Sequence, residues 1–329
     1  MAAEETTVTD AAIQKILRYG SALALTLLLL ATSGAAHAQA LRPGVMGLIP
    51  FRLNGQNYFI AYREGTTDAR FYRLSPDGWS WEQLSQYYLG TIGGEVMPYE
   101  VNGQPYFLYY DDFKGSLTFN RILPDGGHFQ ALGTTAWAGD GWSLTPYQVN
   151  GQPYFIAYSA NSGQVFFNHI LPNGAQFERV ATYIWDKSLV IRVYTVNGAP
   201  YFVTYPRGKL ATKASFYHIL PDGAHYEFLT TRQFDKGWSH LVFFPLNGDL
   251  YLLRYLGLGN GTGNDADYSL DRISASGQLF DHIDPNSWDE GYAFYNFWDS
   301  LMWFNVNGET HTIAARSDTG LSAIIQMPW

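Results

Sequence analysis

The chain has 329 residues, carries 20 Lys and Arg against 29 Asp and Glu, and has a net charge of −9. Because nucleic acids and anionic membranes are bound by clustered Lys and Arg, this acidic balance argues against both as partners. Cysteine is absent, which excludes disulfides, thiolate metal sites and a cysteine nucleophile.

The N-terminus predicts an export signal. An apolar stretch over residues 20–36 follows two basic residues and ends in an A-x-A triplet before Gln39. This order is typical of a cleaved secretory signal peptide, residues 1–38, and the stretch is too short and wrongly flanked for a membrane span. We expect a secreted or periplasmic mature protein with no membrane insertion after cleavage. The acidic residues of the leader keep an uncleaved membrane anchor open as the alternative.

The rest of the chain, residues 39–329, is built from a repeat. Asn-Gly recurs at intervals of 48, 48, 47, 50 and 60 residues, at Asn54, Asn102, Asn150, Asn197, Asn247 and Asn307. Each copy separates two aromatic and β-branched runs, which is the signature of a hairpin with a type I′ turn. A second turn signal follows in the unit, at Asp77-Gly78, Asp125-Gly126, Asn173-Gly174 and Asp222-Gly223. Two hairpins give four antiparallel strands per unit.

The period and the strand composition predict an all-β fold, a β-propeller of six four-stranded blades in a single domain. Runs such as residues 106–110 are apolar on both faces, as expected for a sheet covered on both sides. An open solenoid or a pair of β-sandwiches is the alternative, but neither explains two tight hairpins per period. The expected repeats are residues 45–92, 93–140, 141–188, 189–237, 238–297 and 298–329 plus 39–44.

The last repeat ends after its third strand, near residues 324–329. Its fourth, outer strand is therefore missing at the C-terminus. Residues 39–42 resemble the outer strand of the second unit, because Gln39-Ala40-Leu41 repeats Gln130-Ala131-Leu132. We expect the N-terminal segment to supply this strand and to latch the ring.

Function is expected on the loop face, which carries the loops between second and third strands and the links between units, opposite the tight turns. Only this face varies in length and chemistry. Its Trp and Asp residues suit carbohydrate, because an indole stacks on a sugar ring while carboxylates bond its hydroxyls. The predicted ligand-binding residues are Trp137, Asp140, Trp185, Asp186, Asp235, Trp288 and Asp289. The repeated tryptophans Trp142, Trp238 and Trp298 are expected to pack between blades.

Two further sets of polar residues lie elsewhere in the repeat. Glu95, His240 and Asp299 begin inner strands and form a candidate acid/base group in the central channel, although polar channel linings are ordinary. A second set lies just before or within the entry to the later turns, and we expect its basic members to donate to blade carbonyls or to a neighbouring blade: Arg73, Arg121, His169, His218, Arg272 and Gln326.

The insertion at residues 257–267 is rich in Gly, Asn and Asp. Asp265 and Asp267 are weak candidates for a Ca²⁺ site, since oxygen ligands and glycines suit that ion. The insertion lacks the alternating acidic pattern of strong calcium loops, so we expect a solvated loop and no cofactor.

The chain resembles secreted tandem-repeat propellers of the tectonin and tachylectin-like lectin type. The resemblance lies in its repeated units Gly-Trp-Ser, Asn-Gly-Gln-Pro-Tyr-Phe and Ile-Leu-Pro-Asp-Gly. The resemblance covers residues 45–329, rests on repeat style, and implies a multivalent binder of surface glycans. We therefore expect a carbohydrate-binding protein rather than an enzyme, with glycans or glycoconjugates as partners. The alternatives are a polysaccharide-active hydrolase or lyase acting in the channel, and a protein-binding scaffold.

Overall fold

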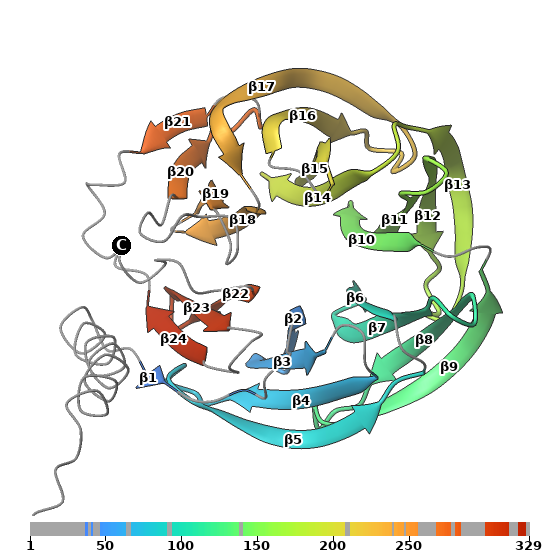
Figure 1. The fold of residues 1–329 in the computed structure, drawn as a ribbon. Coiled ribbons are helices and arrows are strands. Elements are labelled where there is room, and N and C mark those ends of the chain that lie inside the picture. Colours follow the sequence, from blue (N-terminus) through green and yellow to red (C-terminus); the bar gives the residue numbers. More distant parts are fainter. Residues whose placement is uncertain are drawn as a thin grey trace, which may run out of the picture.

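The computed structural model describes residues 37–38, 41, 47–63, 67–90, 94–137, 141–207, 211–238, 240–246, 248–255, 268–277, 280–283, 300–315 and 322–326. These residues form six four-stranded antiparallel sheets arranged around a centre (Figure 1). They contain strands and no helix, and consequently no helix among them is long and apolar enough to cross a membrane. The predicted all-β propeller is confirmed.

Each sheet is one blade, numbered here in chain order. The first blade contains β2 (Gly47–Leu53), β3 (Gln56–Tyr62), β4 (Asp68–Leu74) and β5 (Trp81–Tyr88). The second contains β6 (Glu95–Val101), β7 (Gln104–Asp111), β8 (Ser116–Ile122) and β9 (Phe129–Ala136). The third contains β10 (Trp142–Val149), β11 (Gln152–Ser159), β12 (Gln164–Ile170) and β13 (Phe177–Ile184). The fourth blade contains β14 (Leu189–Val196), β15 (Ala199–Pro206), β16 (Ala211–Ile219) and β17 (Tyr226–Trp238). The fifth contains β18 (His240–Leu246), β19 (Asp249–Tyr255), β20 (Tyr268–Ile273) and β21 (Phe280–Ile283). The sixth blade combines β22 (Ser300–Val306), β23 (Glu309–Ala315) and β24 (Ser322–Gln326) with β1 (His37–Ala38).

The tight turns form where the Asn-Gly pairs predict them. In the first blade, Asn54 has φ 52° and Gly55 has φ 81°, so both central residues of the two-residue loop are left-handed, as a type I′ turn requires. Asn102, Asn150, Asn197 and Asn307 repeat this conformation. The first strand of each blade lies nearest the centre and the fourth forms the rim (Figure 1).

The ring is closed by the N-terminal segment, two residues earlier than expected. The expected strand was Gln39–Arg42, whereas the structure pairs His37 with Ile324 and Ala38 with Ala323. The backbone N–H of Leu41 then donates to the Ser322 hydroxyl at 3.0 Å. The predicted signal peptide lies outside the described residues except for His37 and Ala38, which form β1.

Neighbouring blades are joined by a repeated tyrosine on the innermost strand. The hydroxyls of Tyr99 and Tyr147 each donate, at 2.6 Å, to the carbonyl of the turn glycine in the next blade, Gly174 and Gly223 respectively. A Cβ on Gly223 would lie 2.5 Å from the Tyr154 ring, which explains why the turn uses glycine. The apolar residues between blades are fully buried, as for Phe155 and Phe202.

The repeated basic residues bond within their own blades. Each faces an acidic or amide residue across the third and fourth strands: Arg73–Glu82, Arg121–Gln130, His169–Glu178, His218–Glu227 and Arg272–Asp281. Hydrogen bonds or ion pairs join all five pairs. Because these pairs are largely exposed, each contributes little stability. Their partners are side chains of the same blade, whereas the sequence predicted blade carbonyls or a neighbouring blade.

Candidate functional site

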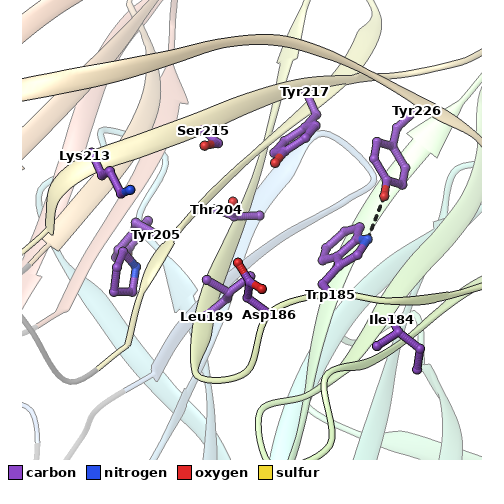
Figure 2. Close-up of a pocket in the computed structure, with 11 residues that line it drawn as sticks. Ile184, Trp185, Asp186, Leu189, Thr204, Tyr205, Lys213, Ser215, Tyr217 and Tyr226 are labelled. Carbon is purple, nitrogen blue, oxygen red and sulfur yellow. Dashed lines mark hydrogen bonds between the residues drawn. The ribbon is translucent and has the colours of Figure 1, made fainter.

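A cavity of about 510 Å³ opens on the loop face between the third and fourth blades. We call it the Trp185 cavity. Its lining comes from the end of β13, from the link that follows it and from all four strands of the fourth blade (Figure 2): Ile184, Trp185, Asp186, Leu189, Thr204, Tyr205, Pro206, Lys213, Ser215, Tyr217 and Tyr226. This volume falls within the range of roughly 300–1,000 Å³ that small-molecule pockets occupy.

Trp185 forms an aromatic wall of this cavity. It directly follows β13, and its backbone N–H donates to the carbonyl of Gly163 at 2.8 Å, which fixes the start of the link. Its indole stacks on Phe202, with ring centroids 5.3 Å apart and planes 11° apart. The indole Nε1 donates to the Tyr226 hydroxyl at 2.7 Å (Figure 2). The half-buried ring is therefore held in one orientation before any ligand arrives.

Tyr226 is left with a proton to donate. Burial raises the pKa of its phenol, partly opposed by the hydrogen bond from Trp185, so the hydroxyl stays protonated near neutral pH. Because it accepts from the indole, its own O–H remains directed elsewhere. The pair thus combines a flat apolar surface with a hydroxyl donor at the cavity wall.

Asp186 supplies the carboxylate. Its backbone carbonyl accepts a hydrogen bond of 2.7 Å from the Tyr158 hydroxyl, and the same hydroxyl accepts from the backbone N–H of Leu189 at 2.9 Å. The link is therefore anchored through its main chain, while the Asp186 side chain is exposed at the cavity. In Figure 2 the carboxylate lies between Trp185 on one side and Lys213 on the other.

The cavity exists because small side chains face it from the sheet. Thr204 of β15 pairs directly with Ser215 of β16. In the third blade the equivalent pair is Ala157 and Phe166, and there Trp142 stacks on Phe166 at 4.9 Å. The guanidinium of Arg179 also lies 3.5 Å over the Phe166 ring. An aromatic residue thus fills the space that Ser215 leaves open.

Trp137 occupies the position equivalent to Trp185 at the filled junction. Its backbone N–H donates to Gly115, as that of Trp185 does to Gly163. Its ring contacts Trp142 and Phe166 and is only 7% exposed. The predicted ligand residue Trp137 therefore packs between blades and does not face solvent. Trp142 and Trp238, which were expected to pack between blades, are also buried.

The remaining predicted ligand and metal residues fall outside the described part of the chain, wholly or in their side chains. Asp140, Trp288, Asp289, Asp265 and Asp267 lie outside the described residues. The side chain of Asp235, on β17, also lies outside them. Of the three predicted ligand residues whose side chains the structure describes, Trp185 and Asp186 lie together in a cavity and Trp137 does not. Within the described part of the chain, no group of three or more His, Cys, Asp and Glu residues could hold a metal ion.

The predicted channel residues do not form a catalytic pair in the described structure. Glu95 accepts a 3.0 Å hydrogen bond from the backbone N–H of Leu144 in the next blade, and the His240 ring stacks on Tyr255 at 4.6 Å. Their strands, β6 and β18, lie on opposite sides of the centre (Figure 1). Asp299 lies outside the described residues.

Thr204, Ser215, Tyr217 and Tyr226 were missed by sequence reasoning. They lie within strands, whereas the ligand-binding residues were predicted on the loop face. The sequence does carry a signal for this cavity, because Ser215 occupies the repeat position that Phe166 holds in the preceding blade. This equivalence becomes visible only once the strand register is known.

Comparison with known proteins supports the fold. No family model matches the chain, and no curated protein matches it. Among solved structures, it is similar to a putative 6-phosphogluconolactonase from Bacteroides uniformis, with TM-score 0.55, 12% identity, and coverage of 88% of this chain and 86% of that one. It is also similar to an exo-β-1,3-galactanase from Phanerochaete chrysosporium with bound β-1,3-galactotriose, with TM-score 0.52, 9% identity, and coverage of 87% and 69%. At these identities the likeness concerns the fold alone, and the chain is a β-propeller.

Proposed function

We propose that the protein binds carbohydrate in the Trp185 cavity. The observation that carries this proposal is the convergence of Trp185 and Asp186 with sheet hydroxyls in one cavity on the loop face. The indole offers a flat surface for a sugar ring, while Asp186, Thr204 and Ser215 can bond its hydroxyl groups. Lys213 adds a cationic donor at the edge.

Binding rather than bond cleavage is the activity that these groups support. Glycoside hydrolysis generally uses two carboxylic groups on opposite sides of the scissile bond. Asp186 is the one carboxylate among the described residues that line the cavity. The galactanase of similar fold, with its bound galactotriose, agrees with a sugar ligand but does not carry the argument.

The proposal includes export. The apolar leader before Gln39 supports a secreted or periplasmic protein that meets glycans outside the cytoplasm. A lectin of the tectonin and tachylectin-like type, with several weak sites on one rigid face, is the specific form of the proposal.

A glycan-array screen of the protein tests the proposal, with each positive glycan then titrated calorimetrically. Replacing Ser215 with Phe copies the residue that fills the neighbouring junction, and replacing Asp186 with Asn removes the carboxylate while keeping the main-chain anchor. We expect each variant to weaken binding by about tenfold or more, a loss of roughly 1.4 kcal/mol.

The matched control is Glu178→Gln, which removes a carboxylate from β13 of the third blade, outside the cavity. Its glycan affinity should equal that of the unaltered protein, and all variants should keep their melting temperature. A blank array would overturn the proposal, as would glycan binding that neither cavity variant weakens. Release of shorter sugars from a bound glycan would instead favour the hydrolase alternative.

A further inference from the structure

The junction between the sixth and first blades joins the two ends of the repeat array (Figure 1). We call it the closing junction. The two blades share one apolar core, to which Phe304 of the sixth blade and Trp81 of the first both belong. The turn between β4 and β5, with Gly78 and Trp79, reaches across to His311 on β23.

The strand register shows that the closing junction uses a histidine where the other blades use a tyrosine. His311 pairs with Phe304 as Tyr106 pairs with Tyr99. The same position in the first five blades holds Tyr58, Tyr106, Tyr154, Tyr201 and Tyr251. The sixth blade therefore places a titratable imidazole where its neighbours place a phenol.

The turn that meets His311 has changed as well. At the first four of these positions, the tyrosine ring packs on the turn glycine of the next blade, as Tyr106 does on Gly174. The residue after the turn glycine is small in the second, third and fourth blades, namely Gly127, Ala175 and Ala224. In the first blade it is Trp79, whose ring centroid lies 5.0 Å from that of His311 at an angle of 78°. A smaller ring on one side of the junction is thus matched by a larger one on the other.

The imidazole of His311 is buried with one nitrogen unbonded. The residue is 1% exposed, and its ring stacks on Phe304 at 5.5 Å. Its Nδ1 lies 3.3 Å from the backbone carbonyl of Glu309. Because a carbonyl can only accept, Nδ1 carries the proton of the neutral ring. Nε2 is buried and has no hydrogen-bond partner in the structure. Protonation would place a charge and a second N–H at a point without an acceptor, which is costly.

The carboxylates near this ring do not remove that cost. Among the described residues, Glu309 on the same strand and Asp77 on the facing turn favour the charged form, but burial outweighs both and lowers the pKa of His311 from 6.5. On β24 the residue paired with His311 is Gln326, which carries no charge. A lowered folded-state pKa means that the stabilisation of the closed junction is complete above 6.5 and is lost as the pH falls through the lowered value.

We propose that the closing junction is an acid-sensitive switch, in which protonation of His311 separates the sixth blade from the first and opens the ring there before any other junction. The other junctions carry phenols at this position, and a phenol gains no charge as the pH falls. The chain ends meet at this junction, so its opening leaves the remaining five junctions intact. The proposal does not depend on carbohydrate binding.

Hydrogen–deuterium exchange followed by mass spectrometry tests the switch between pH 8 and pH 5, the range in which histidine titrates. Exchange rates are corrected for the intrinsic effect of pH and read as equilibrium constants for local opening. In peptides from β22, β23 and the turn between β4 and β5, we expect this constant to rise below pH 6.5 by up to about tenfold for each pH unit, as one added proton allows. Peptides from β10, β11 and the turn between β16 and β17 report the junction of the third and fourth blades and should not change.

Two variants connect the response to His311. His311→Phe keeps a ring against Phe304 and removes the titrating group, so the rise below pH 6.5 should disappear. The double replacement His311→Tyr with Trp79→Ala copies the pair Tyr106 and Ala175 of a neighbouring junction. It decides the question if the single variant does not fold, and it too should show no rise. The matched control is His128→Gln, which removes a histidine with a 57% exposed side chain and should keep the full response.

Two results would overturn the proposal. One is opening at the closing junction that does not increase below pH 6.5, or that increases equally at the junction of the third and fourth blades. The other is a pH response that persists in the folded variants without His311, because another group would then be responsible for it.

Discussion

At the scale of single residues, the tyrosines that join neighbouring blades are the clearest test of what holds the ring together. The Tyr147 hydroxyl is buried and bonds the carbonyl of Gly223 in the next blade. Burial raises the pKa of this phenol, so it stays a neutral donor across the physiological range. Tyr147→Phe keeps the ring stacked on Tyr154 and leaves the carbonyl without this donor. We expect a loss of roughly 1–3 kcal/mol in the free energy of unfolding, measured by denaturant titration.

The control for this variant is Tyr88→Phe, at a tyrosine that is 73% exposed on the outer strand β5. Surface substitutions of this kind usually change stability by less than about 0.5 kcal/mol. Equal losses in the two variants would contradict the role assigned to the Tyr147 hydroxyl.

At the scale of elements, the turn between β16 and β17 shows how a strand connection depends on pH. Asp222 accepts hydrogen bonds from the backbone N–H groups of His225 and Ala224 and faces His225 Nδ1 at 2.6 Å. These bonds lower the pKa of its carboxyl from 3.8 to about 2. A lowered folded-state pKa means that the stabilisation is present above 3.8 and is lost as the pH falls towards 2.

Asp222→Asn therefore tests the turn. We expect the unaltered protein to melt at a higher temperature than the variant at pH 5, and the difference to shrink steadily between pH 4 and pH 2. Thermal unfolding followed by circular dichroism at several pH values measures it. A difference that stays constant down to pH 2 would show that the carboxylate charge does not stabilise this turn.

The turns were predictable from the sequence because their chemistry is local. Asn-Gly specifies positive φ at two adjacent residues, so Asn54 and its equivalents could be assigned without knowing any partner. The Trp185 cavity was not predictable in the same way. Ser215 and Phe166 occupy the same repeat position, but only the pairing of Thr204 and Ala157 with them shows that one junction is open and the other filled.

Trp137 and Trp185 show the same limit for the candidate site. They follow equivalent strands and look alike in sequence, yet one packs between blades and the other lines a cavity. The difference arises in the next blade, from side chains about 20 to 30 residues further along the chain. A pattern read within one repeat does not contain that information.

At the scale of the whole molecule, closure of the ring depends on a very short strand. The sixth blade takes three strands from the C-terminal part of the chain and its outer strand, β1, from His37 and Ala38. Closing a ring with strands from both ends covers an edge that would otherwise present unpaired backbone groups. Cleavage of the leader before Gln39 would remove both residues of β1, whereas cleavage two or more residues earlier would keep them.

Comparing a chain that begins at Ala36 with one that begins at Gln39 tests the contribution of β1. Both retain Leu41 and its bond to Ser322, so they differ only in the residues of the strand and the one before it. Because a few backbone hydrogen bonds are lost and the edge of β24 is uncovered, we expect the shorter chain to melt roughly 2–8 °C lower. A chain beginning at Ala36 with His37→Ala should melt with the longer chain, since β1 acts through its backbone. Identical melting temperatures for the two lengths would show that the ring is closed without β1, and the latch would then reside in the segment around Leu41.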